Sequence, residues 1–124
     1  LSKMIKDSEE NEKKELIGTL VEWLTTKDKV YENARNFAAF ELGLCKADTA
    51  ITALFNVLEN PDELSSVRYY SAMALGMIGG KETAHKLNEI FRREKKRNIQ
   101  EIIAYAIFFI KYIKLKLKSN SFKI

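Results

Sequence analysis

The chain has 124 residues, of which 46% are hydrophobic and 31% charged, with a single proline. This balance is typical of one folded helical domain and excludes an extensively disordered chain, and the length leaves little room for the deep pocket of an enzyme. The net charge of +4 hides an asymmetry, because residues 1–80 carry 9 basic against 13 acidic side chains and residues 81–124 carry 12 against 4.

The cysteine content and the hydropathy pattern predict a cytoplasmic protein without a transmembrane segment. The single cysteine, Cys45, has no partner for an internal disulfide, and no charged-then-apolar signal segment opens the chain. The longest apolar run, residues 102–113, is interrupted by Lys111. It is also shorter than the roughly 20 residues that a membrane-spanning helix needs.

Hydrophobic spacing predicts three helices in the first half of the chain. Residues 1–11 are polar, and we expect them to form a flexible N-terminal segment. A domain over 12–117 then begins with a helix over 12–26, in which apolar residues recur every three or four positions. Two further helices are predicted over 29–45 and 48–59, capped by Asp28 and Asp48.

Helix-breaking residues divide the second half in the same way. A fourth helix over 62–78 follows the break at Pro61, and a fifth over 82–94 follows Gly79 and Gly80. Asn98 and Glu101 resemble a capping box and predict a sixth helix over 98–116. Short connections predict that consecutive helices are antiparallel neighbours, and residues 118–124 are expected to form a C-terminal tail.

A repeat with a period of 33 residues is the most informative pattern. Residues 34–44 read ARNFAAFELGL, and residues 67–77 read VRYYSAMALGM. A period in this range is the signature of stacked helical hairpins. The register pairs Arg35 with Arg68, Phe37 with Tyr70, Ala39 with Ala72, Leu42 with Leu75, Gly43 with Gly76, Leu54 with Leu87 and Leu58 with Phe91.

The repeat is incomplete at both ends. A weaker third copy begins at Ile99, where Gln100 replaces the arginine and Phe108 replaces the glycine. The first helix matches only the second half of a repeat, with Leu24 corresponding to Leu58. We therefore expect an array that begins and ends with half a hairpin and that exposes apolar surface there.

This pattern resembles the HEAT-like repeats of phycobilin lyase-type and related armadillo-type α-solenoid proteins over residues 12–113. The resemblance implies an all-α fold, a right-handed α-solenoid of about six antiparallel-stacked helices. It also implies that Arg35 and Arg68 form a structural ladder with acidic or carbonyl groups of adjacent repeats. The small residues Ala39, Ala72, Gly43 and Gly76 complete the structural repeat, because the first helix of each unit must approach its neighbours closely.

Enzyme chemistry is poorly supported by the sequence. The chain has one histidine, His85, and neither a nucleotide-binding glycine loop nor a spacing suited to a metal. The HEAT-like hydroxylases that bind iron use repeated His-Glu motifs, which this chain lacks. We expect no catalytic, cofactor-binding or metal-binding residues, and we expect His85 to be a solvated surface residue.

The leading hypothesis is a non-enzymatic protein-binding or scaffold module. The sixth helix is apolar over most of its circumference, and only one side can pack on the fifth helix. The remainder is expected to contact another protein, a second copy or a continuation of the repeat array, the alternative being that Phe122 and Ile124 of the tail fold back over it. The candidate partner-binding residues are Tyr105, Phe108, Phe109, Tyr112 and Leu115 on this helix and Thr52, Asn56, His85 and Glu89 on the shorter helices.

Two alternative functions stay open. The basic run of Arg92, Arg93, Lys95, Lys96 and Arg97 is a candidate phosphate-binding cluster for nucleic acid, although no aromatic residues interleave to stack on bases. The other alternative, a lyase or chaperone for a pigment or cofactor, is implied by the family resemblance alone.

Overall fold

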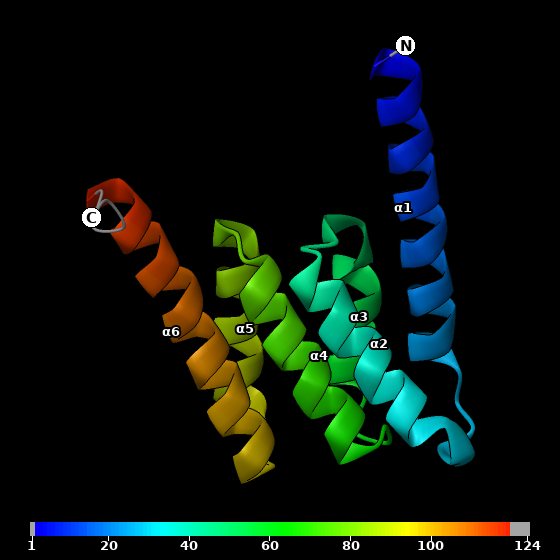
Figure 1. Cartoon of the computed structure of the whole chain (residues 1–124). Helices are drawn as coiled ribbons and strands as arrows, with labels where there is room; N and C mark the ends of the chain where they lie inside the picture. The colour runs from blue at the N-terminus through cyan, green and yellow to red at the C-terminus, as the bar shows by residue number, and fades with distance from the viewer. Residues whose placement is uncertain (1, 120–124) are drawn as a thin grey trace.

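The computed structural model describes residues 2–119, and in this range it is built from helices without a strand. The helices form the expected α-solenoid (Figure 1). The predicted tail contact of Phe122 and Ile124 lies outside the described residues. The elements are α1 (Ser2–Thr25), η1 (Lys29–Tyr31), α2 (Glu32–Leu44), η2 (Asp48–Ala50), α3 (Ile51–Glu59), α4 (Ser65–Ile78), α5 (Lys81–Arg93) and α6 (Arg97–Ser119).

The first helix is longer than its hydrophobic pattern predicted. α1 begins at Ser2, ten residues before the expected start at Glu12. Its first half is rich in good helix formers, and Glu9 and Glu10 precede Lys13 and Lys14 by four residues, which is the favourable order for such pairs. The flexibility of residues 1–11 stays a prediction.

Three helix starts differ from those that the capping residues indicated. α4 begins at Ser65 because residues 60–64 form a turn, in which the backbone N–H of Asp62 donates to Asn60 Oδ1 over 3.0 Å. α6 begins at Arg97, so Asn98 lies inside the helix and does not cap it. α3 begins at Ile51 after η2, and Asp48 makes no capping hydrogen bond. Asp28, in contrast, accepts one from the backbone N–H of Val30 over 3.1 Å.

The helices pair into hairpins differently from what the sequence predicted, because each arginine-bearing helix is the second helix of its hairpin and not the first. α1 packs against α2, α3 against α4 and α5 against α6, while α4 and α5 touch only sparsely. Within residues 2–119 the array therefore consists of three complete hairpins, and the expectation of a half hairpin at each end is wrong. α2, α4 and α6 also lie side by side in one layer (Figure 1).

Small residues let the helices of that layer approach closely. A Cβ atom added to Gly43 would lie 2.8 Å from Ala74 Cα, and one added to Gly76 would lie 2.8 Å from Ala106 Cβ. Both glycines are therefore needed at the crossings of α2 with α4 and of α4 with α6. Leucines fill the space between the hairpins, since Leu24, Leu42, Leu54, Leu58, Leu75 and Leu87 are fully buried.

Candidate functional site

Two buried arginines tie the hairpins together. Arg35 Nε donates to the Leu24 carbonyl over 3.0 Å and Nη1 donates to Glu63 Oε1 over 2.7 Å. In the next unit, Arg68 Nε donates to the Leu58 carbonyl over 2.8 Å, and Nη2 lies 2.5 Å from Glu94 Oε1. We call each set of contacts an arginine bracket.

Each bracket joins one hairpin to the next. The carbonyl belongs to the last turn of the first helix in the arginine's own hairpin, where no partner exists within the helix. The glutamate belongs to the connecting loop of the following hairpin. The side chains of Arg35 and Arg68 are only 1% and 3% exposed, so these ion pairs are shielded from water and salt.

The brackets shift the titration of their glutamates. The hydrogen bond from Arg35 lowers the pKa of Glu63, and this effect and the charge of Arg35 outweigh the opposing effect of burial. Burial raises the pKa of Glu94, but hydrogen bonds from Arg68 and from the backbone N–H of Lys96 more than offset it. Both carboxyl groups therefore have a pKa below the ordinary value of 4.5.

The third unit keeps half of this arrangement. Gln100 Nε2 donates to the Phe91 carbonyl over 3.0 Å, which is the contact that the arginine Nε makes in the other two units. A neutral amide replaces the guanidinium, so no following glutamate is required to compensate a buried charge. Phe108 stands at the position of Gly43 and Gly76, and its side chain is exposed.

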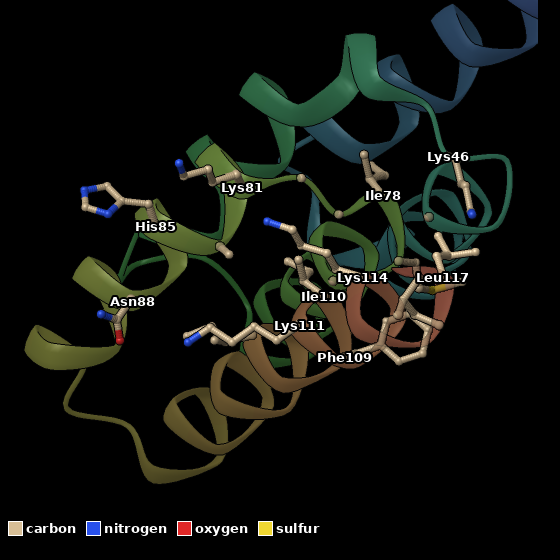
Figure 2. A pocket seen from close by; sticks show the side chains of 18 of the residues that line it. Lys46, Ile78, Lys81, His85, Asn88, Phe109, Ile110, Lys111, Lys114 and Leu117 are labelled. Carbon is tan, nitrogen blue, oxygen red and sulfur yellow. The ribbon is translucent and has the colours of Figure 1, made fainter. Parts of the chain in front are cut away.

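An open groove of about 820 Å³ lies where α2 and α4 end, α5 begins and the second half of α6 passes over them. Its surface is mainly apolar, with Ile78 from α4 and Ile110 and Leu117 from α6 among the lining residues (Figure 2). Ligand sites in proteins commonly have this size and an apolar lining with a few polar groups. The groove can therefore hold several apolar side chains of a bound molecule.

Lysines provide the charge of this groove. Lys46, Lys81, Lys111 and Lys114 line it, and the described lining residues include no carboxylate (Figure 2). α5 also begins here at Lys81, and its N-cap residue Gly80 offers no side-chain cap, so the N–H groups of its first turn add positive potential. The groove is suited to an anionic group attached to an apolar body.

Lys46 has a backbone conformation that lysine rarely adopts. Its φ angle is 50°, in the left-handed region, and the repeat register pairs it with Gly79, whose φ angle is 79°. The backbone N–H groups of Lys46 and Ala47 bond to Gly43 and Leu42, which closes the end of α2. Glycine would adopt this conformation without strain, whereas lysine has an unfavourable backbone conformation here.

The structure brings together only part of the predicted partner-binding set. His85 and Phe109 line the groove, whereas Thr52, Asn56 and Glu89 are exposed outside it. His85 is a surface residue whose Nε2 lies 3.1 Å from Glu89 Oε1 one helical turn away. The other predicted residues, Tyr105, Phe108, Tyr112 and Leu115, lie exposed on α6 and do not line the groove.

Carboxylates interrupt the candidate phosphate-binding cluster. Arg93 lies 3.4 Å from Glu59, and Glu94, inside the basic run, is held by Arg68. Lys96 Nζ donates to Ser65 Oγ. A smaller cavity of about 330 Å³ at this place is lined by Glu59 and Glu94 as well as by Arg93 and Lys95. Arg92, Lys95 and Arg97 are exposed, but they do not share a purely basic cavity.

Sequence reasoning missed the lysines of the groove. Lys111 and Lys114 are three residues apart and therefore fall on one side of α6, a spacing that could have been recognised in the sequence. Extending the repeat register by two residues beyond Leu44 also places Lys46 against Gly79. No local pattern links these residues to Lys81, because only the packing of α5 and α6 brings them to one groove.

The comparisons with known proteins agree with the repeat. A family model of HEAT repeats matches residues 17–107. No curated protein and no solved structure matches the chain significantly. Between residues 2 and 119, no helix is both long and apolar enough to cross a membrane. No group of three or more metal-binding side chains gathers in this part of the chain.

Proposed function

Because the chain belongs to the HEAT-repeat family, whose repeats generally serve as protein-interaction scaffolds, we propose that it binds a partner protein through the lysine-lined groove. The observation that carries the proposal is an apolar groove with four lysines and no carboxylate among its described lining residues. The proposal requires no catalysis.

The chemistry of the groove specifies the partner segment. An amphipathic helix can place large apolar side chains on the groove floor, which removes apolar surface from water. Acidic residues flanking this apolar face would meet the lysines, which favours rapid association and discriminates against basic segments. We therefore infer that the partner supplies an acidic amphipathic segment.

A peptide titration tests this function. The probe is a fluorescent 18-residue amphipathic peptide of leucine and glutamate, and the negative probe has lysine in place of glutamate. We expect the acidic peptide to bind at low salt, and the double variant Lys81→Glu, Lys114→Glu to weaken binding by about tenfold or more. Lys13→Glu, Lys14→Glu on α1 is the matched control, because both lysines are exposed and neither lines the groove.

The outcomes separate the groove from general charge attraction. Equal affinity of the acidic peptide for the groove variant and the control variant would place binding elsewhere on the surface. No binding of the acidic peptide even at low salt would overturn the proposed partner chemistry. Fluorescence anisotropy measures both results.

Lys46 offers a second variant that separates binding from folding. Lys46→Gly relieves the left-handed strain and should raise the free energy of unfolding by about 1 kcal/mol. It also removes one of the four lysines, so the acidic peptide should bind more weakly to a more stable protein. A variant that is more stable and binds equally well would show that Lys46 does not contact the partner.

A further inference from the structure

The outer face of α6 carries a stripe of large side chains outside the groove. Tyr105, Phe108, Tyr112 and Leu115 are all exposed and follow one another at spacings of three, four and three residues. This spacing places them on one side of the helix. Among the described helices, α6 lies at one end of the array (Figure 1). The rings of Phe108 and Tyr112 stack with their centroids 6.0 Å apart. We call these four residues the α6 stripe.

A further hairpin cannot cover the α6 stripe in the way that α6 covers α4. At the crossings of α2 with α4 and of α4 with α6, a glycine of the first helix packs against an alanine of the second. The two lie so close that a Cβ atom on the glycine would not fit. Phe108 occupies the corresponding position on α6 and presents a whole ring there. The stripe therefore requires an occupant that packs on large side chains at a greater interaxial distance.

A second α6 helix has the side chains that such a contact requires. In an antiparallel pair centred on residue 110, Tyr105 lies opposite Leu115 of the second copy and Phe108 lies opposite Tyr112. The alternating three- and four-residue spacing is that of the seam between two packed helices. α6 has 23 residues, a length of roughly 34 Å, so the contact can extend along the array edge.

The charges on α6 select the antiparallel direction. Glu101 lies in line with the stripe near the start of the helix, whereas Lys111, Lys114, Lys116 and Lys118 lie in its second half. A parallel pair would place the two lysine-rich halves side by side. An antiparallel pair separates them and brings Glu101 near Lys118 of the second copy.

We propose that this protein forms a two-fold homodimer in which the α6 stripes of two copies pack antiparallel. Such an interface is self-complementary and closed, so it predicts dimers and no larger filament. The proposal is independent of the groove, because no stripe residue lines the groove. Dimerisation would place two grooves in one assembly and permit bivalent binding.

The mass of the protein in solution tests the dimer. We expect sedimentation to give twice the 14.3 kDa of one chain at high concentration, dissociating on dilution. Phe108→Glu should raise the dissociation constant by at least about tenfold, because it places a carboxylate at the centre of the interface. Leu16→Glu on α1 is the matched control, with a side chain 66% exposed against 69% for Phe108, and it should leave the dimer intact.

Disulfide trapping tests the direction of packing. In a Cys45→Ser background, mixing Tyr105→Cys with Leu115→Cys should give a crosslinked dimer, while each variant alone should not crosslink efficiently. Crosslinking of each variant alone would indicate parallel packing and overturn the proposed arrangement. A wild-type chain that stays monomeric at every concentration would overturn the dimer and leave a different protein as the occupant. Equal dissociation constants for Phe108→Glu and Leu16→Glu would place the interface elsewhere.

Discussion

α4 and α6 occupy equivalent places in the repeat, yet α4 packs against a neighbouring layer helix on both sides and α6 on only one among the described helices. α4 packs against α2 on one side and against α6 on the other, with Arg68 buried and Gly76 at the closest approach. α6 packs against α4 in the same way, but it carries Gln100 and Phe108 at the corresponding positions. Two residue differences thus distinguish α4, which is packed on both sides, from α6, whose outer side is exposed in the described part of the chain.

The comparison shows which part of the repeat serves stability and which part is free to change. The inward contact of the repeat, a side chain donating to the last turn of the preceding helix, is made by Arg35, Arg68 and Gln100 alike. The outward contact to a glutamate is made only where a further described hairpin supplies one. The outward side of the repeat is therefore the side where new binding surfaces can arise.

The largest expected effect comes from breaking a bracket. Arg68→Leu leaves Glu94 and the Leu58 carbonyl buried without their main partner, so we expect a loss of about 3–5 kcal/mol in the free energy of unfolding. Gln100→Leu removes one neutral hydrogen bond in the third unit and should cost only about 1 kcal/mol. Urea denaturation measures both. Equal losses would contradict the distinction between the two units.

The next effect concerns the close crossing of α4 and α6. Gly76→Val forces a side chain into the space held by Ala106, where the backbone cannot easily yield, and should cost about 1–3 kcal/mol. Gly18→Ala on α1 is the opposite case, because nothing lies within 4 Å of an added Cβ atom. It should stabilise the helix by up to about 1 kcal/mol. Thermal unfolding of the two variants should therefore shift in opposite directions.

The smallest effect is a dependence of stability on pH. Glu63 and Glu94 have a lowered pKa in the folded chain, so their contribution to stability is complete well above pH 4.5 and is lost as the pH falls below it. The double variant Glu63→Gln, Glu94→Gln should be less stable than the wild type at pH 7. This difference should shrink as the pH is lowered through 4.5 toward 3, as followed by urea denaturation. A difference that stays constant with pH would show that the brackets do not hold these carboxylates ionised.

The repeat made most of the fold predictable from the sequence. The positions of Arg35, Arg68, Gly43 and Gly76 define the fold class, because they repeat at one period in a helical pattern. The start of α1 was not predictable in the same way. Its first half has no apolar stripe, and only the helix propensity of charged residues supports it. The pairing of the helices into hairpins was missed as well. A period of 33 residues fits a hairpin of α1 with α2 as well as a hairpin of α2 with α3, so the period alone does not distinguish them.

The candidate site was predictable only in part. Phe108 and Tyr112 stood out because the repeat fails there, and the structure shows them exposed. The lysine-lined groove could not be predicted from the sequence. Lys46 and Lys114 are 68 positions apart, and only the packing of α2, α4 and α6 brings both to the same groove. The basic run from Arg92 to Arg97 was conspicuous in the sequence, but the sequence did not reveal that Glu59 lies beside Arg93.

The arginine brackets also determine how the array unfolds. Each bracket crosses a boundary between hairpins, so a hairpin that opens takes away a charge partner from its neighbour. In a linear array, such nearest-neighbour coupling opposes stepwise fraying and makes the units unfold together. We therefore expect local opening to be most costly at the junctions between hairpins and the three hairpins to unfold as one cooperative unit.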